Sequence, residues 1–408
     1  MPSTIRTIIT LHLIAAGACG VRPEGRPAAT VTRVDSAGVD LVTTSGIEFL
    51  PRWVLDTVPQ LSIGGAEQRG PEAFVMVAGA LELADGSIVV SDLAPAAVFL
   101  FDSRGRFLRQ LIRSGAGPGE LRYAGGPIRL GGDSLGIFDS PQGRLVVLGG
   151  DFRHLATIQL VPFRGDNGEY AVPVWVVSSR DAIGFRSRLD VPRSVGVQRR
   201  PMVVGRIPFD GARFDSITAG RGIEIYQTAS GMGWGVPMGA GSVFGIGRTA
   251  VYGGDTDESA VGSWTLDGRM TRSIRWVAPP DPVTADDWRR AVAAESTSLE
   301  SSPETRRAKP EFRRSLIARL QSLPPPKQAR RFTFLVPTDD GGVWIQRRPR
   351  RWLEVSEYLV ADSTGALVAR VDVPTRIHPF QIGPDWVLAR FLTEDDVQLV
   401  RRYRLLRD

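Results

Sequence analysis

The stretch of sequence that decides the fold is "LADGSIVVSDLAPAAVFLFDSRGRFLRQL", residues 83–111. It contains three short apolar runs, which lie at residues 88–90, 98–101 and 107–111. The runs are separated by DLAP and DSRG, two sequences rich in residues that form turns. Short apolar runs between such turns are typical of antiparallel strands joined by hairpins. We therefore expect three consecutive strands here.

The same pattern returns 47 residues later. When the chain is shifted by this length, "DSLGIFDSPQGRLVVLGG" at residues 133–150 falls under the first two runs, and Asp139 lies under Asp92. The third run is then supplied by "HLATIQL" at residues 154–160. A sheet unit of about 40 to 50 residues that repeats is the signature of a β-propeller blade.

Later segments repeat the pattern less regularly, at residues 242–276 and 339–374. The turn sequence Asp-Ser-X-Gly occurs at residues 35–38, 102–105 and 362–365. An aspartate that opens a turn and a glycine that closes it suit hairpins that need a positive φ.

Three segments carry a resemblance to a known family: "GALELADGSIVVSD" (79–92), "VFLFDSRGRFLRQLIRSGAGPGE" (98–120) and "VLARFLTEDDVQLVRRYRL" (387–405). They resemble bacterial six-bladed β-propellers related to NHL-repeat proteins. The resemblance implies an all-β fold of six blades with four strands each, and the chain length leaves seven blades open. We expect residues 31–408 to form a single propeller domain. The motifs mark a fold and no activity.

Closure of the ring and the joints between blades can also be predicted. Strands near residues 32–44 or 53–63 are expected to complete the last blade beside residues 390–405, which would remove exposed sheet edges. The Gly-rich loop at residues 113–127 raises the alternative of a phosphate site. Such a site needs a following helix and a lysine, and the first lysine is Lys309. We interpret the loop as the joint between two blades.

A segment at about residues 283–328 interrupts the strand pattern. Thr284 is a candidate N-cap before a first helix. A second helix is indicated by helical spacing and ends at a run of three prolines; its apolar residues are Phe312, Leu316, Ile317 and Leu320. We expect two inserted helices over or beside one face of the propeller. They would form a structural flap, or a lid or docking surface for an acidic partner or anionic lipid.

The N-terminus resembles an export signal. Arg6 precedes an apolar run at residues 8–18, which is followed by Cys19, the only cysteine. We predict a signal peptide over residues 1–18 and a tether over residues 19–30. Cys19 is the candidate lipidation site, with the alternative that it is simply the first mature residue. The expected location is the periplasm or the outer membrane, with a lipid anchor.

The charge of the chain is uneven. The net charge is +6, and the segment at residues 283–331 accounts for +5 of it, with eleven basic and six acidic residues. This distribution argues against a nucleic-acid surface that extends over the whole protein. A second basic cluster, RRPRRW, could hold a stacked base or a phosphate, but a turn of solvated arginines, which needs no ligand, is the favoured interpretation. The candidate binding residues are Arg347, Arg348, Arg350, Arg351 and Trp352.

No catalytic set is recognisable. Of three histidines, His12 lies in the predicted signal, so a three-histidine zinc site cannot be built from the rest. The single asparagine, Asn167, argues against the metal site of propeller lactonases. Seven aspartates are expected in turns, where their side chains cap the backbone: Asp85, Asp92, Asp139, Asp255, Asp257, Asp339 and Asp340. No catalytic or metal residue is assigned, and Ca²⁺ near the channel is left open.

These observations predict an exported, non-enzymatic, monomeric propeller that binds a protein, peptide or glycan at the cell envelope, without a cofactor and without nucleic acid. The alternative is a divalent-cation-dependent hydrolase or lactonase of the propeller type. A third hypothesis is a binder of anionic surfaces that uses residues 347–351 and the inserted helices.

Overall fold

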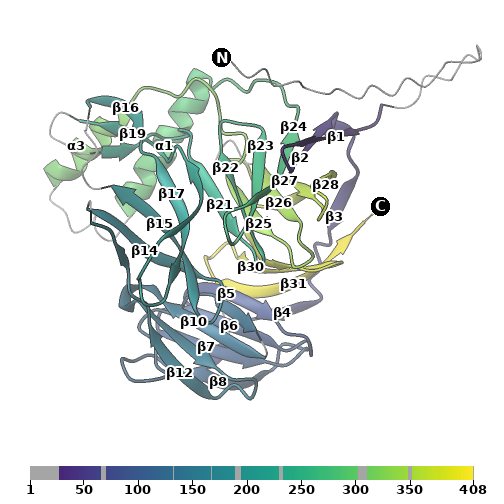
Figure 1. Ribbon diagram of the computed structural model, residues 1–408, viewed down its shortest axis with the longest axis vertical. Helices are drawn as coiled ribbons and strands as arrows, with labels where there is room; N and C mark the ends of the chain where they lie inside the picture. Colours follow the sequence, from purple (N-terminus) through teal and green to yellow (C-terminus); the bar gives the residue numbers. More distant parts are fainter. Residues whose placement is uncertain are drawn as a thin grey trace, which may run out of the picture.

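The structure, a computed structural model, describes residues 27–407 apart from 66–69, 132, 167, 189–193, 229–232, 302–309 and 348–351. Within this part of the chain, six antiparallel four-stranded blades form a β-propeller (Figure 1). The first strand of each blade lies innermost, and the first strands of blades four, five, six, one and two contact one another in this order. The all-β six-bladed prediction is confirmed, and so is the inserted helical segment.

The first two blades are built from the repeated sequence. Blade one contains β5 (Val77–Glu82), β6 (Ile88–Leu93), β7 (Ala96–Phe101) and β8 (Phe107–Ile112). Blade two contains β9 (Pro127–Gly131), β10 (Ser134–Asp139), β11 (Arg144–Leu148) and β12 (His154–Gln159). Their outermost strands, β8 and β12, begin 47 residues apart, which is the length of the repeat seen in the sequence.

Blades three to five follow in chain order. Blade three contains β14 (Glu169–Val176), β15 (Asp181–Arg188), β17 (Met202–Pro208) and β18 (Asp215–Gly220), with the short β13 (Phe163–Arg164) beside β14. Blade four contains β21 (Ser242–Ile246), β22 (Ala250–Asp255), β23 (Ala260–Thr265) and β24 (Met270–Trp276). Blade five contains β25 (Phe334–Pro337), β26 (Val343–Arg347), β27 (Val355–Ala361) and β28 (Leu367–Pro374).

Blade six closes the ring with strands from distant parts of the sequence. It contains β29 (Ile377–Ile382), β30 (Trp386–Leu392), β31 (Gln398–Leu406) and, as its outermost strand, β4 (Leu61–Ile63). In β4, Ile63 pairs with Val400 and is buried in the core between blades six and one. One of the two predicted closing segments, residues 53–63, is therefore correct.

The other predicted segment lies elsewhere. The hairpin of β1 (Thr30–Ser36) and β2 (Val39–Ser45) extends the outer edge of blade four, where β2 pairs in parallel with β24. Strand β3 (Arg52–Leu55) pairs in parallel with β28 of blade five and antiparallel with β31 of blade six. Three short 3-10 helices complete this inventory: η1 (Ile47–Phe49), η2 (Gly70–Glu72) and η3 (Ser140–Gln142).

The predicted turn chemistry is present in the hairpins. In two Asp-Ser-X-Gly turns the glycine has a positive φ, +77° at Gly105 and +83° at Gly365. The Asp102 carboxylate accepts the N–H groups of Arg104 and Arg106, each at 2.9 Å. The turn type thus follows from the two end residues, as expected.

The Gly-rich loop at residues 113–127 is a joint between blades, as predicted, because it leads from the outermost β8 to the innermost β9. Its polar groups are satisfied within the protein. The Glu120 carboxylate accepts the Gly117 N–H at 2.9 Å, and Arg144 donates to the carbonyls of Gly115 and Ala116. The Gly117 N–H and the Arg113 guanidinium hold the pKa of Glu120 below its usual value. A carboxylate therefore already occupies the position that a phosphate would need.

The propeller has two faces, which differ in their loops. One face carries the loops from the second to the third strand of each blade and the connections between blades; we call it the capped face. The opposite face carries the hairpins between first and second strands and between third and fourth strands; we call it the open face. The capped face is covered in part by α1 (Ala285–Ser301) and α3 (Pro310–Gln321), which lie in the connection from β24 to β25.

The inserted helices follow the sequence prediction closely. The Asp287 N–H donates to Thr284 Oγ1 at 3.1 Å, and the Thr284 N–H donates to Asp287 Oδ2 at 3.0 Å, so Thr284 is the N-cap. In α3, Leu316 and Leu320 are buried, whereas Phe312 is 54% exposed. The base of the insertion is closed by the Ala329 N–H, which donates to the Asp281 carbonyl at 2.8 Å.

Candidate binding site on the capped face

The helices belong to a larger structure on the capped face, which we call the cap. It also contains a small sheet of β16 (Gly196–Arg199), β19 (Glu224–Gln227) and β20 (Gly233–Gly235). Figure 1 shows β16 and β19 together with α1 and α3 at the upper left. Tyr226 and Trp234 of the sheet pack against Val292 and Leu320 of the helices. Three separate connections thus fold into one unit.

A charged cluster fixes the cap to blade four. Asp255, at the end of β22, accepts Arg199 of β16 at 3.0 Å and Arg221 at 2.6 Å. Both arginines also contact Asp257. Burial alone would raise the pKa of Asp255, but hydrogen bonds from Ser242 and Arg221 and the charge of Arg199 outweigh it, so the pKa lies below its ordinary value.

Asp255 and two other aspartates lie in strands, where the sequence had predicted turns. Asp92, Asp139 and Asp255 were expected in turns, but they lie in β6, β10 and β22 and are buried or nearly so. Each accepts a backbone N–H from the connection that precedes its blade, donated by Met76, Arg122 and Arg221 respectively. These aspartates fasten the connections to the blades.

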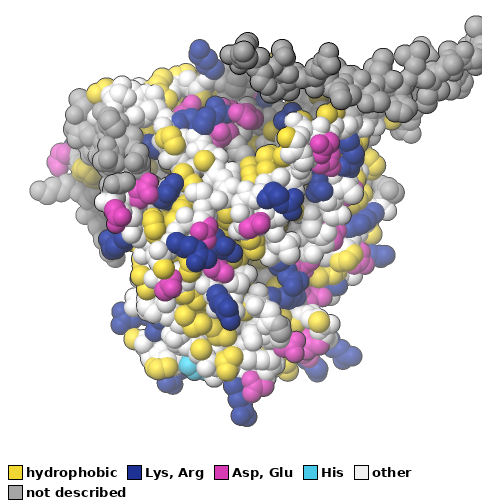
Figure 2. Space-filling model, in the orientation of Figure 1, with side chains coloured by type: hydrophobic (Ala, Val, Ile, Leu, Met, Phe, Trp, Pro, Cys, Tyr) yellow, Lys and Arg dark blue, Asp and Glu magenta, His cyan; other side chains and the backbone are white. Residues whose placement is uncertain are grey.

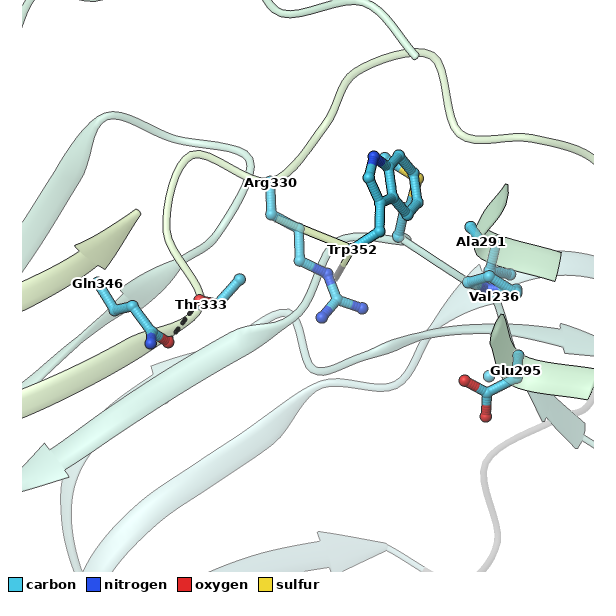
Figure 3. Close-up of a pocket in the computed structure, with 10 residues that line it drawn as sticks. Val236, Ala291, Glu295, Arg330, Thr333, Gln346 and Trp352 are labelled. Atoms are coloured by element: carbon cyan, nitrogen blue, oxygen red, sulfur yellow. Dashed lines mark hydrogen bonds between the residues drawn. The ribbon is translucent and has the colours of Figure 1, made fainter. Parts of the chain in front are cut away.

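A cavity of about 420 Å³ lies between the cap and blade five. Figure 3 shows Gln346 and Thr333 of blade five on one side and Val236, Ala291 and Glu295 of the cap on the other, with Arg330 and Trp352 between them. Two inserted segments and one blade must therefore meet to form the site.

The cap side of the cavity includes a strained turn at residues 236–239. The Gly239 N–H donates to the Val236 carbonyl at 2.9 Å, and Met238 has a φ of +58°. Glu224 of β19 fixes the turn by accepting the Ala240 N–H at 2.9 Å. Non-glycine residues in the left-handed region cost free energy and are concentrated at functional sites, so this turn marks the cavity as a candidate site.

The blade-five side is a chain of polar groups. Thr333 Oγ1 donates to Gln346 Oε1 at 2.9 Å (Figure 3), and Gln346 Nε2 donates to the hydroxyl of the buried Tyr358 at 3.0 Å. Arg330 joins the two sides, because its Nε donates to the Gly239 carbonyl. These contacts hold the lining groups in place before any ligand arrives.

A second hollow shares a lining residue with this cavity. It is a groove of about 870 Å³ that is lined in part by Val355, Pro374, Phe391 and Glu394. Trp352 lines both spaces. The cavity, the groove and the indole ring of Trp352 together form an elongated site that extends from the cap to blade six.

The candidate residues of the RRPRRW segment have different surroundings. Trp352 lines the site. Arg347 ends β26 and is paired with Glu357 at 2.9 Å, which also contacts Arg370 at 3.4 Å. Arg348, Arg350 and Arg351 lie outside the described residues, and so does Cys19.

Sequence reasoning missed Arg330, Gln346 and the turn at Met238. The signal that could have found the turn is "GWGVPMGAG" at residues 233–241, where Trp and Met stand among Gly and Pro just before a blade. The other two residues lie in or beside an ordinary strand pattern and carry no such signal.

Metal-binding groups, membrane-spanning helices and surface charge also bear on the site. In the part of the chain that the structure describes, no three His, Cys, Asp or Glu side chains group as a metal site, and no helix is long and apolar enough to cross a membrane. On the face seen in Figure 2, basic and acidic side chains are interspersed.

Comparison with known proteins supports the fold. Residues 72–160, which include the two repeated blades, match a family described as a 6-bladed beta-propeller. No curated protein matches the chain in sequence.

Several solved structures are similar to this chain. A DUF4221-family member from Bacteroides vulgatus is 10% identical, with a TM-score of 0.47 over 87% of this chain and 98% of that one. A gluconolactonase from Xanthomonas campestris is 13% identical, with a TM-score of 0.39 over 93% and 99%. The calcium-binding protein regucalcin from Agrobacterium tumefaciens is 11% identical, with a TM-score of 0.37 over 88% and 97%. At these identities the similarity says nothing about activity.

Proposed function

We propose that this protein is a binding protein that holds a short peptide or glycan segment in the elongated site on the capped face. The observation that carries the proposal is that Trp352 lines two hollows, one shared with residues of the cap and the other with residues of blade six.

The chemistry of the site suits such a ligand. An indole ring offers a large flat apolar surface to a sugar ring or a peptide side chain. Thr333 Oγ1 and Gln346 Oε1 line the same cavity and, besides the hydrogen bond that they share, keep lone pairs that can accept a hydrogen bond from a ligand. The cavity volume of about 420 Å³ lies within the range of pockets that hold small ligands. An extended ligand would place one unit in the cavity and continue past Trp352.

Export is the second part of the proposal. It rests on the signal-like sequence at residues 1–18 and on Cys19 directly after it. A binding protein with this signal would act in the periplasm or on the outer membrane. Mass spectrometry of the mature N-terminus should find residue 19 as the first residue, with or without a diacylglyceryl group. A mature protein that still contains residues 1–18 would contradict export.

The binding proposal is tested with peptide and glycan arrays probed by the full chain and by two variants. Trp352→Ala should weaken every binding signal by about tenfold or more, because a central aromatic residue carries much of the binding energy. Trp53→Ala is the matched control, since Trp53 lies on β3, outside both hollows. Melting temperatures show that both variants are folded.

Two results would reject the proposal. One is a ligand whose affinity is the same for the wild type and Trp352→Ala. The other is the absence of any array signal for the wild type.

A further inference from the structure

Apart from the two hollows on the capped face, another cavity lies at the propeller axis, near the open face. Its volume is about 230 Å³, and it is formed by the innermost strands of several blades and the hairpins that follow them. Its walls are largely apolar and include Leu81, Trp175 and Ile246. Two arginines and one aspartate complete the lining: Arg129, Arg248 and Asp339.

The charges of this cavity do not cancel. Asp339 Oδ2 lies 3.6 Å from Arg129 Nη1 and accepts Gln381 Nε2 at 2.9 Å. Arg248, in the hairpin after β21, is exposed and forms no hydrogen bond or ion pair within the described part of the chain. One positive charge is therefore left over at the mouth of an apolar cavity.

The framework around the charges is rigid. Gln381 is buried, and its Oε1 accepts the Glu82 N–H at 2.8 Å while its amide nitrogen holds Asp339. Arg129 donates to the Glu82 carbonyl. Blades one, two, five and six are thus fixed to one another at this point, and Arg129 is held in position before a ligand binds.

The geometry points to a binding site for a small monocarboxylate with an apolar body. The carboxylate would pair with Arg248, because a planar guanidinium matches a planar carboxylate with two hydrogen bonds. The apolar body would enter the cavity beside Trp175. A single unbalanced charge suits a monoanion, since Asp339 would repel a dianion such as a phosphate monoester. The volume lies below the usual range for drug-sized ligands, so the acid must be small.

The test measures binding of phenylacetate and of its neutral analogue phenylacetamide to the full chain by ligand-observed NMR titration. Phenylacetate should bind the wild type about tenfold more tightly, because the charged carboxylate accepts stronger hydrogen bonds from a guanidinium than the neutral amide does. Arg248→Ala should remove this difference, and Arg248→Lys should keep part of it. Arg104→Ala is the matched control, since Arg104 lies in a hairpin of blade one on the same face.

Three results would overturn the inference: equal affinity for acid and amide, an unchanged affinity in Arg248→Ala, or no phenylacetate binding to the wild type at millimolar concentration. Because Arg248 is exposed, its substitution should not affect folding, and a melting curve checks this. Trp352→Ala should leave phenylacetate binding unchanged. The two sites therefore succeed or fail independently.

Discussion

Asp139 shows how one side chain can hold a blade in place. It is fully buried, accepts the Arg122 N–H at 2.9 Å and pairs with Arg144 at 3.2 Å. Arg144 in turn holds the carbonyls of the Gly-rich loop. The aspartate thus connects β10, β11 and the joint between blades one and two.

We predict that Asp139→Asn lowers the free energy of unfolding by about 3 kcal/mol, because it leaves a buried arginine charge without its partner. Urea unfolding checks this. Asp372→Asn is the control, since Asp372 and Arg52 form an exposed pair, for which a change of at most about 1 kcal/mol is expected. Equal effects of the two substitutions would contradict the assigned role of Asp139.

At the level of residues, prediction from sequence worked where the interaction is local. Thr284 and the turn aspartate Asp102 contact backbone groups within a few positions, and both were identified correctly. Asp92, Asp139 and Asp255 were misplaced because their partners lie 16, 17 and 34 residues away. Arg330 was missed for the same reason, since its contact at Gly239 is 91 residues distant.

The cap is attached to blade four by charged side chains. Its ionic attachment at Asp255 should depend on pH. The pKa of Asp255 is lower in the folded protein than in the unfolded chain. Its contribution to stability is therefore complete above the unfolded value of about 4 and is lost as the pH falls through the lower, folded value.

Asp255→Asn should accordingly lower stability at neutral pH and flatten the loss of stability below about pH 4. Urea unfolding at a series of pH values measures the slope of the free energy of unfolding against pH. Glu258→Gln is the control, because Glu258 belongs to the same cluster but is largely exposed. A slope for Asp255→Asn as steep as that of the wild type would show that Asp255 is not the titrating group.

The helices of the cap should also be separable from the propeller. Because Asp281 and Ala329 are hydrogen-bonded neighbours, residues 282–328 can be replaced by a short turn. We expect the variant to keep its β-sheet circular dichroism and to lose array binding, since Ala291 and Glu295 of the cavity are removed. Loss of the sheet signal would show that the helices are required for folding. Retained binding would contradict a site beneath the cap.

Sequence patterns predicted the helices but not the cap as a unit. The strands β16, β19 and β20 contain three or four residues each, too few for a periodic pattern. They pair across connections that leave and re-enter different blades. Their position depends on the whole ring, so the cavity above blade five could not be inferred from local spacing.

At the scale of the whole molecule, the ring depends on a strand of three residues. Strand β4 pairs with β31, and Ile63 completes the core between the first and last blades. This closure joins the last blade to the first and completes the ring on whose two faces the proposed sites lie. The repeat predicted three of the four strands of blades one and two to within a few residues. It could not choose between the two closing segments, because their apolar patterns are alike.

An engineered disulfide tests this closure most directly. Ser62 and Arg401 are paired neighbours in β4 and β31, and Arg401 Nε donates to Ser62 Oγ at 3.3 Å, so the two side chains lie on the same side of the sheet. In a Cys19→Ser background, Ser62→Cys with Arg401→Cys should form a bond under mild oxidation and raise the melting temperature relative to the reduced protein, since it closes a very long loop. Thiols that stay free in the folded protein would contradict the closed six-bladed ring.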